Sequence, residues 1–141
     1  MATYTHFAKQ PDVLKHLILC EVLKNETPQV YVETNSACAI YPMTQTPEQQ
    51  YGIYHFLEKA DEVPSLKDSV YYQLESGEMA KGNYLGSPAL AMNVLGKQAK
   101  RFVFFDLEKS ALKNVGTYAK QIGLSASVEI HHTDSSRGTI E

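Results

Sequence analysis

The sequence has little of what would assign it to a specialised class of protein. It holds two cysteines, Cys20 and Cys38, whose separation matches no metal-binding spacing. This usage indicates reduced thiols in a cytoplasmic protein. No apolar run approaches the roughly 20 residues of a membrane-spanning helix, and the opening MATYTHFAKQ lacks the apolar core of a signal peptide. We therefore expect a cytoplasmic protein with no membrane partner.

A strong charge excess and the common catalytic motifs are absent as well. The net charge of −3 over 141 residues creates no global field that would attract nucleic acid, although a local patch would suffice. No Walker loop GxxxxGK[ST], no GxSxG elbow and no HExxH or Cys/His spacing occurs. These absences argue against a P-loop nucleotide hydrolase, a serine hydrolase and a metal site.

What is present is an alternation of strand-like and helix-like segments. Chain length and a hydrophobic content of 43% indicate one compact domain, 1–141. Runs rich in β-branched and aromatic residues predict strands at 29–34, 101–108 and 127–132. Helical spacing and helix-end signals predict helices at 12–24, 47–60, 65–77, 88–98 and 109–123. The alternation predicts an α/β fold with a parallel sheet, and the middle helices predict a helical insertion at 44–82.

Acidic residues follow each predicted strand, namely Glu33, Asp106 and Asp134. In open α/β sheets, ligands bind outside the carboxyl ends of the strands, and an acid after the second strand commonly accepts hydrogen bonds from ribose hydroxyls. The pattern predicts a ligand that carries a nucleoside. The alternative is that Asp106 only ends its strand in solvent.

Two loops are candidates for contact with such a ligand. The first, ETNSACAIY, has Ala37 and Ala39 where glycines would let a backbone approach closely, and neither adopts positive φ cheaply. The second, YLGSP, offers Gly86 for close approach, Ser87 as a hydroxyl and Pro88 for the first helical turn. The alternative for YLGSP is a helix cap with no further role.

Taken in order, these segments resemble the RlmJ-type family of bacterial 23S ribosomal RNA adenine-N6 methyltransferases, which use S-adenosylmethionine (SAM). The run PDVLKH is similar to the family's ADVLKH, and YLGSP to its YPGSP. ETNSACAIY is similar to DTHAGAGxY, with Asn35 for the histidine and alanines for both glycines. QQYGIYHFL resembles a YLxGI-like segment of the family's helical insertion. Asp106 stands for the acid after the second strand, and Asp134 with Ser135 for an Asp-Gly pair after the third.

This resemblance implies the N-terminal part of a Rossmann-like SAM-dependent methyltransferase sheet, with a small helical insertion. It implies methyl transfer to the N6 amino group of an adenine in ribosomal RNA. In that site, Lys15, His16 and Asn35 contact the carboxylate end of SAM and Ser87 lines the same pocket. Asp106 binds the ribose, while Asp134 and Ser135 bind the adenine.

The chain departs from the family in one decisive respect. The family's catalytic Asp-Pro-Pro-Tyr motif occurs nowhere before Glu141, so no residue is assigned as catalytic. We therefore expect an incomplete methyltransferase domain, inactive alone, whose first strand has an open edge. The alternative is a degenerate, non-catalytic module that dimerises or binds a partner through that edge. A different nucleotide-binding α/β protein is a third interpretation.

The segment PDVLKH poses the sharpest question, because Lys15 and His16 stand where an apolar helix begins. Composition alone favours a solvated helix face. The later motifs predict instead that both residues point into a cofactor pocket. On that interpretation, Leu14, Leu17 and Ile18 pack the helix against the sheet.

Overall fold

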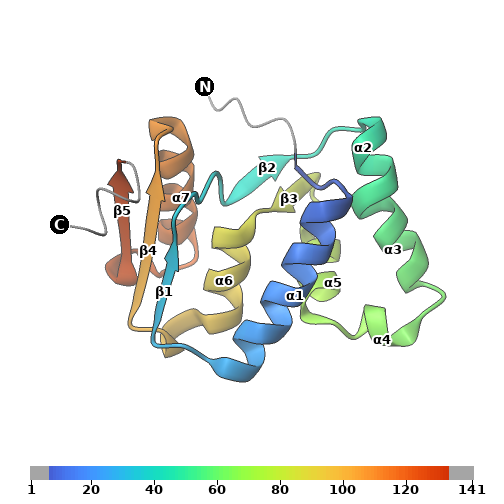
Figure 1. The fold of residues 1–141 in the computed structure, drawn as a ribbon, viewed down its shortest axis with the longest axis horizontal. Helices are drawn as coiled ribbons and strands as arrows, with labels where there is room; N and C mark the ends of the chain where they lie inside the picture. Colours follow the sequence, from blue (N-terminus) through green and yellow to red (C-terminus); the bar gives the residue numbers. More distant parts are fainter. Residues whose placement is uncertain (1–6, 134–141) are drawn as a thin grey trace.

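The computed structural model describes residues 7–133. It shows an α/β protein with a small parallel three-stranded sheet, helices beside it and a separate two-stranded sheet (Figure 1). The three-stranded sheet has the order β1–β4–β5, formed by β1 (Val30–Glu33), β4 (Arg101–Asp106) and β5 (Val128–His132). Both pairings are parallel, so the parallel sheet predicted from the three strand-like segments is confirmed.

The middle strand β4 anchors the sheet in the core. Phe102 and Phe104 are fully buried on one face, and Val103 and Phe105 are nearly so on the other. An uninterrupted apolar run is what a strand buried on both faces requires. The parallel register pairs Glu33 with Phe104. The carboxyl ends of β1 and β4 therefore lie at the same end of the sheet.

Three helices pack beside this sheet: α1 (Gln10–Glu26), α6 (Ser87–Leu95) and α7 (Lys109–Gln121). Two of them begin with a proline in the first turn, where the missing N–H costs nothing. The strong amphipathic pattern of α7 places its apolar side against β4 and β5. Short 3-10 turns follow at Gly96–Gln98 (η2) and Ser125–Ser127 (η3).

The predicted orientation of α1 is wrong for two of its three apolar residues. Leu14 and Ile18 are 60% and 53% exposed, whereas Leu17 packs against the core. The buried face instead carries Val13, His16, Cys20 and Leu23. The helix packs mainly on α6 and α5, so the partner helices, not the sheet, select which side is buried.

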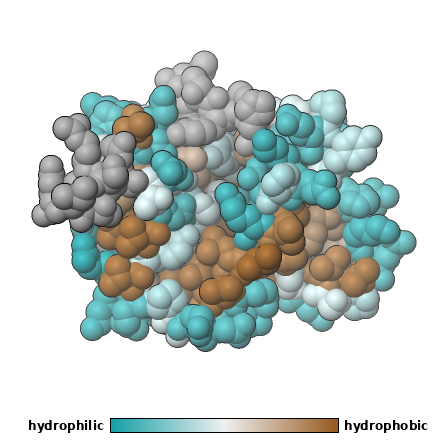
Figure 2. Space-filling view, in the orientation of Figure 1, coloured by the Kyte–Doolittle hydropathy of each residue, from teal (hydrophilic) through white to brown (hydrophobic). Residues whose placement is uncertain are grey.

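The exposed side of α1 continues onto the sheet edge as an apolar strip. Figure 2 shows hydrophobic side chains gathered near the centre of this face, over α1 and β1. We call these residues the α1–β1 strip: Leu14, Ile18, Val22, Val30 and Val32. Among the described residues β1 pairs only with β4, so its other edge carries free backbone groups.

A run of short helices fills most of the range predicted as an insertion. They are α2 (Pro47–Gln49), the π-helical turn η1 (Gln50–Tyr54), α3 (His55–Ala60), α4 (Pro64–Lys67) and α5 (Val70–Met79). The helix predicted over 47–60 is interrupted at Gly52, which has φ −97° and ψ −106°. The Ala8 carbonyl accepts a hydrogen bond from Ile53 N–H at 2.9 Å and occupies the space of a Gly52 side chain. That the insertion is a subdomain stays a prediction.

The second sheet joins two segments that the sequence predicted as loops. Strand β2 (Ile40–Pro42) pairs antiparallel with β3 (Asn83–Leu85). Each has three residues, too few for an alternating pattern to be recognised. The pairing brings YLGSP against the loop that follows β1, and Gly86 N–H donates to the Ala39 carbonyl at 2.8 Å.

Within residues 7–133, no helix combines the length and the apolar character needed to cross a bilayer.

Candidate functional site

Four of the predicted cofactor residues line one pocket at the carboxyl end of β1. They are Lys15 and His16 from α1, Asn35 from the loop after β1, and Ser87 from the first turn of α6. The pocket consists of two cavities of about 310 and 130 Å³ that share these four residues. The structure thus brings together side chains that are up to 72 positions apart in the sequence, from Lys15 to Ser87.

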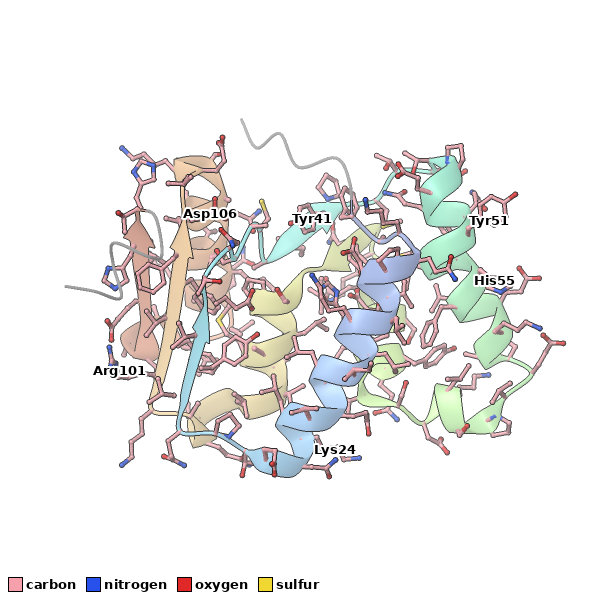
Figure 3. All side chains as sticks on the ribbon, viewed as in Figure 1. Lys24, Tyr41, Tyr51, His55, Arg101 and Asp106 are labelled. Carbon is pink, nitrogen blue, oxygen red and sulfur yellow. The ribbon has the colours of Figure 1, made fainter. Side chains whose placement is uncertain are left out.

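The smaller cavity has an aromatic wall. The ring of Phe7 stacks on Tyr41 with centroids 4.5 Å apart, and Tyr84 follows at 5.9 Å from Phe7. All three rings line this cavity. Figure 3 shows Tyr41 at the same end of the molecule as Asp106. The pocket therefore combines polar groups from α1 and β1 with an apolar surface.

Glu33, which the sequence indicated only as one of three strand-end acids, is a pocket residue to which no ligand contact was assigned. Its Oε1 accepts a hydrogen bond from the Ser87 hydroxyl at 2.6 Å, and its Oε2 accepts one from the Tyr31 hydroxyl at 2.8 Å. Burial raises the pKa of Glu33 to about 7, although both hydroxyls and the Lys15 charge lower it. The position of Glu33 at the end of a strand was the sequence signal that could have identified it as a pocket residue. The burial that raises its pKa was not visible in the sequence.

His16 is buried, although composition alone favoured a solvated helix face for it. Only 6% of its surface is exposed, and its Nδ1 lies 3.2 Å from the Tyr84 hydroxyl. Burial lowers the pKa of His16 to about 4, and the nearby Lys15 charge adds to this effect. The imidazole is therefore neutral at physiological pH.

Charged side chains of both signs line the pocket. Lys15 is exposed on α1 and contributes the positive charge to both cavities. Asp12 lines the smaller cavity, and burial raises its pKa while Lys15 and Lys9 lower it. With Glu33 in the larger cavity, the site presents a cation next to carboxyl groups.

Asp106 lies behind the pocket wall and holds the loop after β1. Its Oδ2 accepts a hydrogen bond from Ala37 N–H and its Oδ1 one from Glu108 N–H, both at 2.8 Å. Asp106 is buried and lines neither cavity. The ribose contact predicted for it stays a prediction. The predicted adenine contacts, Asp134 and Ser135, lie outside the described residues.

The loop that Asp106 holds has an unusual backbone at the first substituted glycine. Ala37 has φ 54°, in the left-handed region that costs a residue with a side chain about 1 kcal/mol. Ala39 is fully buried and its N–H donates to Asn114 Oδ1 at 2.8 Å. The loop therefore keeps a glycine-like conformation without glycine, held by hydrogen bonds from β4 and α7.

A larger hollow of about 780 Å³ lies elsewhere, between the start of α7 and β5. Glu108, Lys109, Ile130 and His132 are among the residues that line it. Of the predicted residues that lie within 7–133, none lines it, and its lining is mainly apolar. We favour the smaller pocket as the site because charged and hydrogen-bonding side chains from three elements converge there. Within the described residues, no three His, Cys, Asp or Glu side chains gather to hold a metal ion.

Among the solved structures that this chain resembles is one that is similar over almost all of its length. It is protein LPL1258 from Legionella pneumophila str. Philadelphia 1, described with the family model DUF519. The match has a TM-score of 0.75 and 26% sequence identity, and it covers 94% of this chain and 51% of the other. This chain therefore spans about half the length of that protein. No protein-family model and no curated protein matches the sequence.

Proposed function

We propose that this chain forms the SAM-binding part of a Rossmann-like methyltransferase that modifies adenine N6 in ribosomal RNA in the cytoplasm. The observation that carries the cofactor assignment is the presence of both Lys15 and Glu33 in the lining of one cavity. The methionine end of SAM is a zwitterion, with a carboxylate that suits a lysine and an ammonium group that suits a carboxylate. The RNA substrate rests on the sequence resemblance alone.

The pocket residues fit the methionine end of SAM in chemical type. Lys15 would bind the carboxylate, and Glu33 the ammonium group. Asn35 and Ser87 would add hydrogen bonds, and the stacked Phe7 and Tyr41 rings would exclude water from one wall. When bound, SAM supplies a methyl group on a sulfonium centre. The task of these residues is to bind and orient it.

The nucleoside end of the ligand is assigned by resemblance. Asp106 would bind the ribose, and Asp134 with Ser135 the adenine. Both Asp106 oxygens already accept hydrogen bonds from backbone N–H groups. A ribose hydroxyl would therefore have to donate an additional hydrogen bond to one of these oxygens, or the loop would have to shift. No residue of the chain is proposed as catalytic.

Replacing Lys15 with alanine is expected to weaken SAM binding about tenfold, the effect of losing one charge-assisted hydrogen bond. The side chain is exposed on α1, so the stability of the fold is expected to change little. Isothermal titration calorimetry with SAM and S-adenosylhomocysteine measures the affinity, and thermal melts measure the stability. Lys24→Ala is the matched control. Lys24 is exposed on the same helix, and it lies at the end of the molecule opposite Tyr41 and Asp106 (Figure 3).

Two results would count against this assignment. Absence of binding at millimolar ligand would remove the cofactor claim for this chain. A Lys15→Ala variant that binds normally but melts at a lower temperature would show that Lys15 serves only the solvated face of α1.

A second candidate function is association through the free edge of β1. It is favoured by the α1–β1 strip, whose residues are each between 47% and 60% exposed. Apolar surface beside an unpaired strand edge favours protein contact. On this proposal the chain is a degenerate, non-catalytic module that dimerises or binds a partner.

Light scattering tests the association proposal. We expect a dimer or larger species that dissociates when Ile18 is replaced by lysine, because a charge on the strip opposes its burial. Val63→Lys is the control, since Val63 is exposed but lies in the insertion, outside the strip. A monodisperse monomer that binds SAM would argue against this second function.

A further inference from the structure

Three buried side chains from three different elements form a hydrogen-bonded chain that runs from the pocket wall into the core. The Tyr71 hydroxyl of α5 lies 2.9 Å from the Tyr84 hydroxyl of β3, and the Tyr84 hydroxyl lies 3.2 Å from His16 Nδ1 of α1. Tyr71 and Tyr84 are essentially inaccessible to solvent. The chain therefore connects the helical insertion with the pocket through the core.

The direction of these hydrogen bonds follows from counting protons. If His16 Nδ1 carried a proton, it would donate to Tyr84, and the three groups would have three protons for two hydrogen bonds. The hydroxyl proton of either Tyr71 or Tyr84 would then have no acceptor, because within residues 7–133 neither hydroxyl has a further hydrogen-bond partner. A buried donor without a partner is costly. In the opposite direction Tyr71 donates to Tyr84, Tyr84 donates to Nδ1, and both hydroxyl protons are bonded.

A neutral imidazole carries one proton on its two ring nitrogens, and the low pKa of His16 keeps the ring neutral at physiological pH. If Nδ1 accepts from Tyr84, that proton is on Nε2. Nε2 has no hydrogen-bond partner among the described residues, and His16 lines both cavities of the pocket. The remaining N–H is thus available to a ligand.

We propose that Tyr71 and Tyr84 hold His16 in the Nε2–H tautomer, so that the pocket presents a neutral hydrogen-bond donor beside Lys15. The ligand group it would take is an anionic acceptor, a carboxylate oxygen. The identification of this group as the SAM carboxylate rests on the proposed function. The assignment of the His16 tautomer does not depend on the proposed function.

This arrangement assigns a task to the helical insertion. Tyr71 belongs to the insertion, and together with Tyr84 it acts as a positioning residue, because both hydroxyls act through His16. A neutral donor next to Lys15 also avoids two adjacent positive charges in a buried site, which would repel each other. A carboxylate can then accept one hydrogen bond from each of Lys15 and His16.

The test uses the full chain labelled with [15N]histidine. The ring nitrogen shifts of His16, assigned with a His16→Asn variant, report its tautomer without any ligand. We expect the Nε2–H form in the parent chain and a mixture of tautomers in Tyr84→Phe. Affinity for S-adenosylhomocysteine, measured by calorimetry, is expected to fall about tenfold in Tyr84→Phe and about threefold in Tyr71→Phe. Tyr72→Phe, on the same helix but outside the hydrogen-bonded chain, is expected to change neither measurement.

The outcomes separate this inference from the proposed function. An Nδ1–H tautomer of His16 in the parent chain overturns it, whether or not any ligand binds. A parent chain with the Nε2–H tautomer that binds no SAM supports the inference and contradicts only the proposed function. Tyr84→Phe with normal affinity overturns the positioning role. If Tyr84→Phe does not fold, the parent tautomer and Tyr71→Phe decide the question, and unchanged affinity in Tyr71→Phe overturns the role of the insertion.

Discussion

Gly86→Ala is expected to lower the free energy of unfolding by about 3 kcal/mol, the upper end of what overpacking costs. A Cβ at this position would fall on the Cys38 carbonyl oxygen and would lie 3.2 Å from the Tyr41 ring. Neither the Gly86 backbone nor the loop after β1 can move away easily, because Gly86 N–H donates to the Ala39 carbonyl at 2.8 Å. Urea denaturation followed by circular dichroism measures the loss.

The chain provides a matched control for this substitution. Gly77 lies inside α5, and a Cβ added there would have no atom within 4 Å. Gly77→Ala is therefore expected to raise stability by about 0.5–1 kcal/mol through helix propensity. Equal stability of Gly86→Ala and the parent chain would contradict the close approach of YLGSP to the loop after β1. Because Ser87 follows directly, a distorted Gly86 is also expected to weaken ligand binding.

Strands and the longest helices could be predicted because their signals are local. The continuous apolar run of β4 and the amphipathic spacing of α7 are decided within a dozen residues. The orientation of α1 could not be predicted in this way. Leu14 and Ile18 look as suitable for burial as Val13 and Leu23 until the positions of α5 and α6 are known. The three-residue strands β2 and β3 exist only through their mutual pairing.

In the candidate site, too, some residues could be predicted from local motifs, whereas the contacts of others depend on the tertiary structure. The motifs DVLKH and YLGSP identified Lys15, His16 and Ser87, and the structure places them around one pocket. Glu33 was indicated as a strand-end acid, but no ligand contact was assigned to it, since its hydrogen bonds from Tyr31 and Ser87 are not visible in the sequence. Asp106, in contrast, gives both oxygens to backbone N–H groups, a use that no sequence pattern reveals.

Affinity for SAM is expected to fall more than tenfold when the pH is lowered from about 8 to about 5.5, because Glu33 becomes protonated. Its pKa of about 7 leaves it mainly ionised at the upper pH and mainly neutral at the lower. An ionised Glu33 attracts the ligand's ammonium group, whereas a protonated one does not. Calorimetric titrations at a series of pH values measure the profile.

Glu33→Gln is the control, because it keeps the size of the side chain and removes the titration. The variant is expected to bind weakly with a flat profile, while any titration of SAM itself would persist in both proteins. A parent profile that equals the Glu33→Gln profile would show that Glu33 does not contact the ligand.

Folding stability has to be followed in the same pH range, because buried groups with shifted pKa values act on it in opposite directions. The pKa of Glu33 is raised from 4.5 to about 7, so the folded chain binds more protons than the unfolded chain in this window, and the Glu33 contribution to stability falls as the pH rises through it. The pKa of His16 is lowered from 6.5 to about 4, so its contribution falls as the pH decreases through that window. Between pH 4.5 and 6.5 these two contributions oppose each other, and the fully buried Glu75, whose pKa is also raised, acts in the same direction as Glu33. Glu33→Gln removes one contribution and leaves the others, so on acidification below pH 6.5 this variant is expected to lose stability relative to the parent chain.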